Sequence, residues 1–398
     1  MGDEFMNKLM IYLLALGAFL TGTAEFVVSG ILEIIAKYLD VSISAAGQLI
    51  SIYSIFYALG AFFLVLLTAK WDRKKVLSIS LFIFFIGNLI AFLSSNFILA
   101  MLSRIILAMS GGLFTVVATN YAAHLASPDK KGKAMATVTT GFTISLAFGV
   151  PIGTLTAAYI DWHYIYLIIG GLTLINLLLL NRLVPKLEAE NSIPLKKQLL
   201  VIKDKKVIAG LLTTVFWILG YTLVFAYISP ILSQGANFTI ELISISLFSL
   251  GIFAFIGTQV GGVMADNWGS VKVITCSLIV NAISLFLMRP FLNSTIAILL
   301  IIIIWALATW TTTPAMHVYM ISLKPQTSEI LLSFNITVMN IGMSIAAGIG
   351  GMVIKYTSTL NLSWIGGVMV IIALALSYYS FAIDKKQNKE KEQICINS

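Results

Sequence analysis

Two charged side chains stand inside otherwise apolar stretches of this sequence, and their chemistry is the first feature to explain. Glu25 lies in the apolar run 9–32, and Arg104 lies in the run 97–120. A charged side chain in hydrocarbon costs about 3 kcal/mol on insertion scales and usually marks a pathway or a partner. Desolvation favours a neutral carboxylic acid, whereas a nearby guanidinium favours the carboxylate. Such a pair could therefore take up and release a proton as its surroundings change.

The two charged residues lie at a similar depth in their runs. Glu25 stands about seven residues before the end of its run, and Arg104 stands about seven residues after the start of its own. At 1.5 Å per residue, both are roughly 10 Å from the same surface if the two helices are antiparallel. The alternative to proton exchange is a permanent ion pair that only holds two helices together.

The elements that must position this pair are membrane helices. Hydrophobic residues make up 59% of the 398 residues, only 11% are charged, and the mean hydropathy is +0.97, which excludes a soluble domain. About 20 apolar residues in helical form cross the hydrocarbon core of a bilayer. The sequence predicts an all-α integral membrane protein with twelve transmembrane helices near 9–32, 45–68, 76–95, 97–120, 135–160, 163–183, 207–232, 242–265, 273–292, 296–321, 331–354 and 363–383.

One long polar connection divides these helices into two sets of six. It covers 184–206, whereas the other connections are short. We therefore expect an N-terminal bundle over 1–183, a cytoplasmic linker over 184–206, a C-terminal bundle over 207–384 and a cytoplasmic tail over 385–398.

Lys and Arg residues in the short loops predict the orientation. If both termini are cytoplasmic, 21 of the 25 Lys and Arg residues face the cytoplasm, and only Lys37, Arg289 and Lys355 face outward. This bias follows the positive-inside rule. The basic residues form small clusters along a membrane surface, so the net charge of +8 does not predict binding of nucleic acid.

No feature of the sequence predicts an enzyme or a bound cofactor. Cys276 falls within a predicted helix and Cys395 in the tail, so neither a disulfide nor a metal site is expected. No paired carboxylates, nucleophile constellation, metal cluster or phosphate-binding loop stands at a helix end.

The fifth predicted helix is unusually rich in glycine and proline for its position. Its run GFTISLAFGVPIGT at 141–154 contains three glycines and Pro151. In a bilayer, the backbone N–H and C=O groups of such a span keep their hydrogen bonds only if the span packs closely on a neighbouring helix. The alternative is that Gly and Pro are simply common in membrane helices.

Two loops at equivalent positions of the halves suggest an internal repeat. The run TAKWDRKKVL at 68–77 follows the second predicted helix, and ADNWGSVKVI at 265–274 follows the eighth. The second loop resembles the loop signature of the major facilitator superfamily, and the resemblance extends over all twelve helices. It implies two pseudo-symmetric bundles and gating loops that contain Lys70, Asp72, Arg73, Asp266 and Gly269. In the first loop, Ala69 stands where an acidic residue is expected and Asp72 where glycine is expected.

Several motifs resemble the bacterial twelve-helix drug:proton antiporters of that superfamily, most closely purine base and nucleoside efflux pumps and the related sugar and chloramphenicol exporters. They are GVPIGT at 149–154, EFVVSGIL at 25–32, AGQL at 46–49 and SFN at 333–335. The resemblance implies that Gly149, Pro151 and Gly153 form a tight, flexible contact with helices of the other half. Arg104 is similar to the arginine of the family's fourth helix, so Glu25 is predicted to carry the proton and Arg104 to tune it.

The resemblance also implies a central cavity, whose substrate contacts would come from aromatic and amide side chains. The candidates are Tyr53, Tyr57, Trp217, Tyr221, Trp310, His317, Asn335 and Asn340. For any one of the aromatic residues, packing or anchoring at the membrane interface is the competing explanation.

The function expected from this resemblance is proton-coupled efflux of drugs, purines or nucleosides by alternating access. The alternatives are a specific metabolite exporter, for a sugar or a siderophore, and a proton symporter or importer. The expected partners are a small-molecule substrate, protons and the lipid bilayer. The protein is expected to act as a monomer in the bacterial plasma membrane, with no metal or other cofactor.

Overall fold

The computed structural model describes residues 2–127, 130–187, 204–324 and 328–397. Within those ranges the chain forms helices and no strand, and twelve helical segments are long and apolar enough to cross a membrane. The predicted all-α architecture with twelve spans is thereby confirmed.

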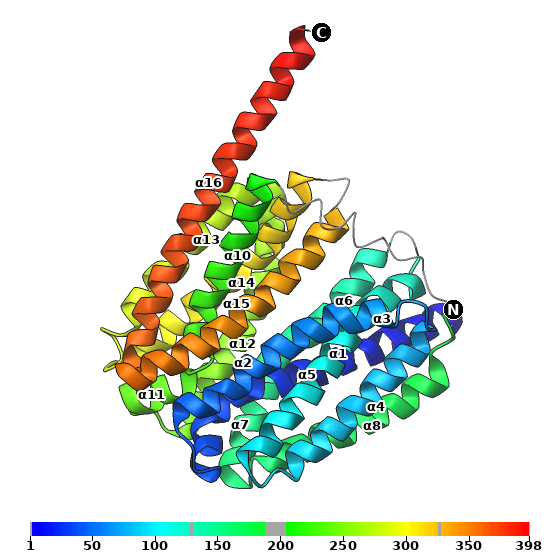
Figure 1. Cartoon of the computed structure of the whole chain (residues 1–398), viewed down its shortest axis with the longest axis vertical. Coiled ribbons are helices and arrows are strands. Elements are labelled where there is room, and N and C mark those ends of the chain that lie inside the picture. The colour runs from blue at the N-terminus through cyan, green and yellow to red at the C-terminus, as the bar shows by residue number, and fades with distance from the viewer. Residues whose placement is uncertain (1, 128–129, 188–203, 325–327, 398) are drawn as a thin grey trace. The chain divides into compact units, whose positions relative to one another are not determined.

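The first six spans are formed by ten helical segments, whose α-helices are labelled in Figure 1. They are α1 (Gly2–Tyr38), α2 (Ile43–Leu59) with η1 (Gly60–Leu64) and α3 (Val65–Leu67), α4 (Arg73–Phe92), α5 (Phe97–Leu125), α6 (Lys131–Ile144) with η2 (Ser145–Gly149) and α7 (Val150–Tyr159), and α8 (His163–Leu183). Here η1 and η2 are π-helical turns inside longer helices.

The other six spans are α10 (Lys205–Phe225), α12 (Ile240–Trp268), α13 (Ser270–Met288), α14 (Thr295–Leu323), α15 (Ser328–Tyr356) and α16 (Leu362–Asn397). A short helix, α11 (Ile228–Ala236), follows α10. The prediction of one continuous helix over 207–232 is therefore wrong beyond Phe225, because the helix breaks just before Pro230. Proline lacks the N–H that would continue the helical hydrogen bonds, and its ring clashes with the preceding turn.

Short polar side chains fix where several helices begin. Ser42, Asp72, Asn96 and Ser294 each accept a hydrogen bond from the backbone N–H three residues later, at distances of 3.1, 2.9, 2.9 and 3.4 Å. Each bond satisfies one of the N–H groups that a helix leaves without a partner in its first turn. The loops between spans can therefore be only a few residues long.

The helices group into two compact units, which we describe separately. Unit 1 contains 1–192, 225–255 and 347–359, and unit 2 contains 193–224, 256–346 and 360–398. The predicted division into a bundle ending at 183, a linker at 184–206, a bundle ending at 384 and a tail stays a prediction. Residues 188–203 of that linker lie outside the described residues.

In unit 1, α1 is the central helix and contacts α2, α5, α6, α7 and α8. Its buried residues Leu14 and Ala18 join a hydrophobic core with Phe114 and Val117 of α5. We call the side of unit 1 where the chain begins the terminus side. The opposite side, with the loops at 39–42, 93–96 and 160–162, is the distal side.

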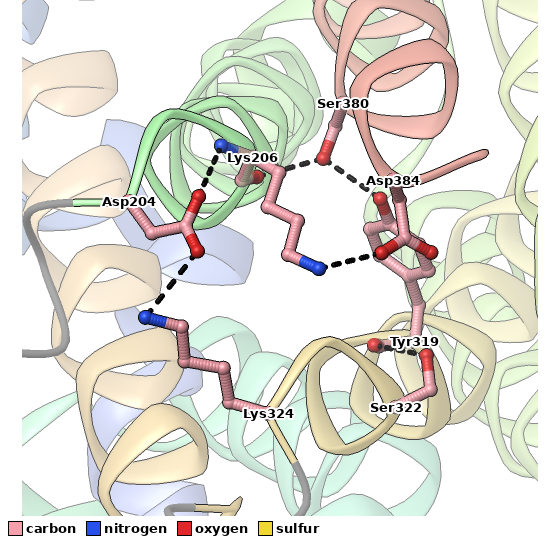
Figure 2. A network of polar contacts seen from close by, with 7 residues as sticks. All are labelled: Asp204, Lys206, Tyr319, Ser322, Lys324, Ser380 and Asp384. Atoms are coloured by element: carbon pink, nitrogen blue, oxygen red, sulfur yellow. Dashed lines mark hydrogen bonds and ion pairs between the residues drawn. The ribbon is translucent and has the colours of Figure 1, made fainter. Parts of the chain in front are cut away.

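Unit 2 contains a network of charged and hydroxyl groups that joins the start of α10 and the end of α14 to α16 (Figure 2). Lys206 is buried, and its Nζ lies 2.7 Å from Asp384 Oδ1 on α16. Lys324 Nζ, just after α14, lies 3.3 Å from Asp204 Oδ2. Ser380 Oγ donates a 2.7 Å hydrogen bond to the carbonyl oxygen of Lys206. The start of α10 is thus fixed to the end of α14 and to α16.

Candidate functional site

Arg104 binds backbone carbonyl groups on two neighbouring helices of unit 1. Its Nη1 donates to Ala24 O at 2.5 Å, its Nη2 to Glu25 O at 3.1 Å and its Nε to Leu49 O at 3.2 Å. The guanidinium carbon also lies 4.0 Å from the centre of the Tyr53 ring, a cation–π geometry. A single side chain of α5 therefore joins α1 and α2.

The Glu25 carboxylate does not share this arrangement. Among the described residues, no ion pair within 4.0 Å joins it to Arg104, and its buried Oε2 has no hydrogen-bond partner. Glu25 is only 5% exposed. The permanent ion pair considered from the sequence is therefore absent, and Arg104 contacts the backbone of Glu25 instead of its carboxylate.

Aromatic side chains enclose the region around Glu25. Tyr53 and Tyr57 stack with ring centres 6.1 Å apart, and the Tyr53 hydroxyl donates to Thr21 O at 3.4 Å. Phe142 of α6 lies 5.3 Å from Phe26 and 6.5 Å from Tyr57, measured between ring centres. The structure thus brings the predicted Tyr53 and Tyr57 together with Glu25 and Arg104, and it adds Phe26 and Phe142.

The predicted antiporter helix has a π-helical turn immediately before its proline. Residues 145–149 form η2, and Pro151 lies in the first turn of α7, where its missing N–H costs least. Gly149 and Gly153 face α1: a Cβ atom at these positions would lie 2.2 Å from Thr23 Oγ1 and 2.3 Å from Val27 Cγ2. The nearest neighbour of these two glycines is therefore α1 of the same half, and their expected contact with the other half stays a prediction.

The contact with the second half is made by another glycine. A Cβ atom on Gly251 of α12 would lie 2.2 Å from the Cα of Ala147 in η2. Beside it, Phe148 and Phe248 meet edge to face at 5.6 Å, and Ser244 Oγ donates to Pro151 O at 3.2 Å. Backbone contact between η2 and α12 requires the glycine of α12, which the sequence analysis missed.

Hydrogen bonds join first-half and second-half segments on the distal side of unit 1. Glu33 accepts a 2.7 Å hydrogen bond from Ser233 Oγ and a 2.9 Å bond from Gln234 Nε2, and Gln234 Oε1 accepts from Thr359 Oγ1 at 3.0 Å. We call Glu33, Ser233, Gln234 and Thr359 the distal clamp. It closes unit 1 between α1, α11 and the segment after α15.

Three further hydrogen bonds support the distal clamp. The Tyr159 hydroxyl donates to the Glu241 carboxylate, and Ser44 Oγ donates to Gly351 O at 2.7 Å. The Tyr227 hydroxyl donates to Ala347 O at 2.7 Å. These hydrogen bonds between the halves thus use hydroxyl, amide and carboxylate side chains together with backbone carbonyl groups.

A separate polar contact orders the loop before α8. The ring nitrogens of His163 lie 2.5 Å from Asp161 Oδ1 and 2.9 Å from Ser94 O. Partial burial raises the pKa of the Asp161 carboxyl, but the hydrogen bonds from the backbone and ring of His163 outweigh that effect and hold the pKa below its ordinary value. This contact joins two distal loops.

In unit 2, the predicted substrate residues form an aromatic cluster on α10 and α14. The Tyr221 ring lies 5.1 Å from the Trp305 ring and meets the Trp310 ring edge-on at 6.2 Å. Trp217 and Trp305 are almost fully buried, and their indole nitrogens have no hydrogen-bond partner within the described ranges. Trp305 was not among the predicted site residues, although it stands five residues before Trp310 on the same helix.

The predicted amide and imidazole residues of unit 2 differ in their surroundings. Asn335 Oδ1 accepts a 2.7 Å hydrogen bond from Thr214 Oγ1, while its buried Nδ2 has no partner. His317 Nε2 is also buried, and no described residue forms a hydrogen bond with it. Asn340 Nδ2 donates to Ile336 O of its own helix at 3.0 Å, so its amide is already used within α15.

The predicted gating loops have simple local structures. Asp72 is the N-cap of α4, and the backbone N–H of Arg73 donates to Leu187 O at 2.9 Å. Lys70 and Asp266 are exposed, and Gly269 has φ +84, a conformation that glycine adopts readily, between α12 and α13. None of these local roles tests the gating function of the two loops, which stays a prediction.

Comparison with known proteins places this geometry in a family. The family model of the Major Facilitator Superfamily matches residues 14–258 and 210–394. The chain is 37% identical over 381 residues to the uncharacterized MFS-type transporter YbcL of Bacillus subtilis, covering 96% of this chain and 98% of that protein. It is 30% identical over 389 residues to the inner membrane transport protein YdhP of Escherichia coli, covering 96% and 97%.

Solved structures share the fold at lower sequence identity. A D-xylose–proton symporter superposes with a TM-score of 0.79 at 17% identity, covering 92% of this chain and 96% of that one. A bacterial homologue of the human lysosomal transporter Spinster, in an inward-facing and occupied conformation, gives 0.78 at 14% identity, covering 94% and 97%. With its twelve spans and its bacterial relatives, the chain is a multi-pass plasma-membrane transporter and belongs to the major facilitator superfamily.

Proposed function

We propose that this transporter exports small organic molecules in exchange for protons, with Glu25 as the proton carrier. The observation that supports this most directly is a buried carboxyl group with no ion-pair partner within 4.0 Å among the residues that the structure describes. Arg104 is held by three backbone carbonyl groups, and these bonds do not depend on the protonation state of Glu25. A proton can therefore bind to and leave Glu25 without dismantling the surrounding helix contacts.

The proposed direction rests on the fifth span. Its motif GVPIGT resembles that of antiporters, and the π-helical turn before Pro151 places its backbone directly against α12. π-Helical turns are frequent at functional sites. The competing function is proton-coupled uptake, which is favoured by the similarity of the fold to a D-xylose–proton symporter.

The proposed substrate class follows from the hydrogen-bonding groups of unit 2. Trp217, Trp305 and Asn335 each have a buried N–H group with no hydrogen-bond partner in the described part of the chain, and indole and amide N–H groups only donate. A buried donor left without an acceptor costs about 1–3 kcal/mol, which a bound acceptor would restore. With the aromatic rings around Tyr221, these donors favour a planar, acceptor-rich heteroaromatic compound, such as a purine, a nucleoside or a drug of similar chemistry.

Proton flux in reconstituted vesicles tests the proton role. Purines, nucleosides, antibiotics and lipophilic cations would be added to proteoliposomes under an imposed pH gradient, and proton movement would be followed with a pH-sensitive dye. We expect at least one class to drive proton movement with the wild-type protein and none with Glu25→Gln. The matched control is Asp40→Asn, because Asp40 is exposed and its left-handed backbone, with φ 52, also suits asparagine.

Glu25→Gln that retains substrate-driven proton movement with the wild-type pH dependence would contradict the proton role. The direction is tested separately in whole cells. Overexpression of an exporter lowers the accumulation of the identified substrate, whereas overexpression of an importer raises it.

A further inference from the structure

The short helix α11 differs from one end to the other in how deeply it is buried. The preceding helix ends at Phe225, and the first residues of α11, Ile228–Leu232, are buried in unit 1. Toward the end of α11, Ser233 is half-buried and Gln234 is exposed. Burial therefore fixes the start of α11 more firmly than its end.

Tyr227, immediately before α11, lies in a slot lined by glycines of α2 and α15. A Cβ atom on Gly47 would lie 2.0 Å from the Tyr227 hydroxyl oxygen, and one on Gly350 would lie 2.4 Å from its Cε2 atom. The Tyr227 side chain is fully buried, and its hydroxyl donates to Ala347 O at 2.7 Å. The start of α11 is thus held by close packing as well as by a hydrogen bond.

The end of α11 is bound by Glu33 of α1. Both carboxylate oxygens take part, because Oε2 accepts from Ser233 Oγ at 2.7 Å and Oε1 accepts from Gln234 Nε2 at 2.9 Å. The Gln234 side chain also accepts from Thr359 Oγ1 at 3.0 Å. Hydrogen bonds with an ionised partner are roughly twice as strong as neutral ones. One anionic side chain of α1 therefore holds α11 and, through Gln234, the segment after α15.

The chemistry of this contact requires a carboxylate. Ser233 and Gln234 both point donors at Glu33, and an ionised carboxylate accepts at both oxygens and donates nothing. A glutamine at position 33 would accept at one oxygen only and would turn its own N–H donors toward the second partner. A neutral side chain of the same size therefore cannot keep both hydrogen bonds.

We propose that Glu33 is the latch that keeps the distal side of unit 1 closed, with α11 as the element that it holds. Opening of the distal side during transport then requires the release of Ser233 and Gln234 from Glu33. The three hydrogen bonds that support the distal clamp contribute to the same closure, so loss of Glu33 should weaken the closed state without abolishing it. The latch acts in the same way whether the transporter exports or imports its substrate.

The accessibility of a buried cysteine tests this proposal. Ser51→Cys is a suitable reporter, because Ser51 of α2 is only 7% exposed and its Oγ would lie 3.7 Å from a Cβ atom on Gly348 of α15. The purified full-length protein in detergent, with Cys276 and Cys395 replaced by Ser, would be labelled with a hydrophilic maleimide. We expect Glu33→Ala to make this labelling about tenfold faster, because a hydrogen bond to a charged group shifts an equilibrium by about that factor.

Further variants test whether the charge and its two donors act as one contact. Glu33→Gln should also accelerate labelling, and Ser233→Ala combined with Gln234→Ala should accelerate it as much as Glu33→Ala does. All three alanine substitutions together should be no faster, because residues that share one contact do not have additive effects. Asp40→Asn, at an exposed position of the same side, is the matched control and should keep the original rate. If Glu33→Ala does not fold, the Ser233 and Gln234 variant provides the same test.

A second reporter separates opening of the distal side from general unfolding. Ser80 is fully buried in α4, within the first half, so Ser80→Cys should stay unlabelled in every variant. An unchanged Ser51→Cys rate would overturn the proposal, and so would additive effects of Glu33→Ala and the Ser233 and Gln234 variant. Equal acceleration at Ser80→Cys would show that Glu33 only stabilises the fold. None of these results depends on whether Glu25 carries a proton.

Discussion

At the scale of single residues, the position of Arg104 is determined by the shape of its guanidinium group. Five N–H donors in a planar fork can reach carbonyl oxygens on two helices at once, whereas the ammonium of lysine is a compact charge. The structure uses the donors on Nε, Nη1 and Nη2 for Leu49, Ala24 and Glu25. Arg104 is therefore a helix connector as well as the neighbouring charge of Glu25.

Replacement of Arg104 by lysine should separate these two roles. Arg104→Lys keeps the positive charge but cannot form all three backbone hydrogen bonds. Hydrogen bonds to charged groups contribute about 1.5–3 kcal/mol each, so we expect the free energy of unfolding to fall by about 3 kcal/mol. The measurement is denaturant unfolding or Tm in detergent. Arg182→Lys, at an exposed position of α8, is the control, and equal stability of the two variants would contradict the connector role.

The sequence indicated that Glu25 and Arg104 lie close together, but not how they contact each other. Depth in the membrane is read from the distance to the ends of an apolar run, so Glu25 and Arg104 could be placed at one level. Whether Arg104 reaches the carboxylate or the carbonyl of Glu25 depends on helix rotation, which hydropathy does not report. The same limit explains why Phe26 and Phe142, ordinary apolar residues in the sequence, were missed.

At the scale of elements, the fifth span shows how small residues determine which helices touch. Gly149 and Gly153 leave room for α1, and Gly251 leaves room for η2. The glycines of this span correctly predicted a close helix contact. They did not indicate which neighbouring helix makes it, because a helix contacts different neighbours on its different faces. The motif could not indicate that the second half would supply its own glycine from α12.

Substitution of Gly251 by alanine should disturb that contact. The added Cβ would lie 2.2 Å from the backbone of Ala147, and backbone atoms cannot rotate away. Forcing extra volume into such a contact costs about 1–3 kcal/mol, so the Tm should fall and α12 should separate from η2. Faster maleimide labelling of Ser244→Cys, in a background with Cys276 and Cys395 replaced by Ser, would report that separation.

The control for this prediction is on the same helix. Gly262 has no atom within 4 Å of an added Cβ, so Gly262→Ala should leave both the Tm and the labelling rate near their starting values. Equal behaviour of the two alanine variants would show that the contact between α12 and η2 tolerates a side chain.

At the scale of the whole molecule, the number of spans was predictable because each span must satisfy its own backbone inside the bilayer. The break between α10 and α11 was not predicted, although Pro230 was visible, because an apolar run continues through it. The distal clamp could not be predicted either. Glu33 and Ser233 are ordinary polar residues separated by 200 positions, and only the folded chain brings them together.

The orientation of the molecule in the membrane gives a further prediction. The positive-inside rule places the terminus side in the cytoplasm. In intact cells, a membrane-impermeant maleimide should therefore label Ser95→Cys, in the loop before α5, and should label Lys74→Cys only after permeabilisation. Both variants would be made in the background without Cys276 and Cys395. The reverse pattern would place both termini outside.

The ion pairs of unit 2 indicate where the chain can be divided into two separately expressed polypeptides. Asp204 and Lys206 stand at the end of the connection between the two sets of spans, and their partners Lys324 and Asp384 come later in the chain (Figure 2). A chain expressed as two polypeptides and cut before Asp204 keeps both ion pairs within the second polypeptide. A cut after Lys206 would leave Asp384 and Lys324 to find their partners on another chain. The split protein should therefore assemble more efficiently when the second polypeptide begins ahead of Asp204.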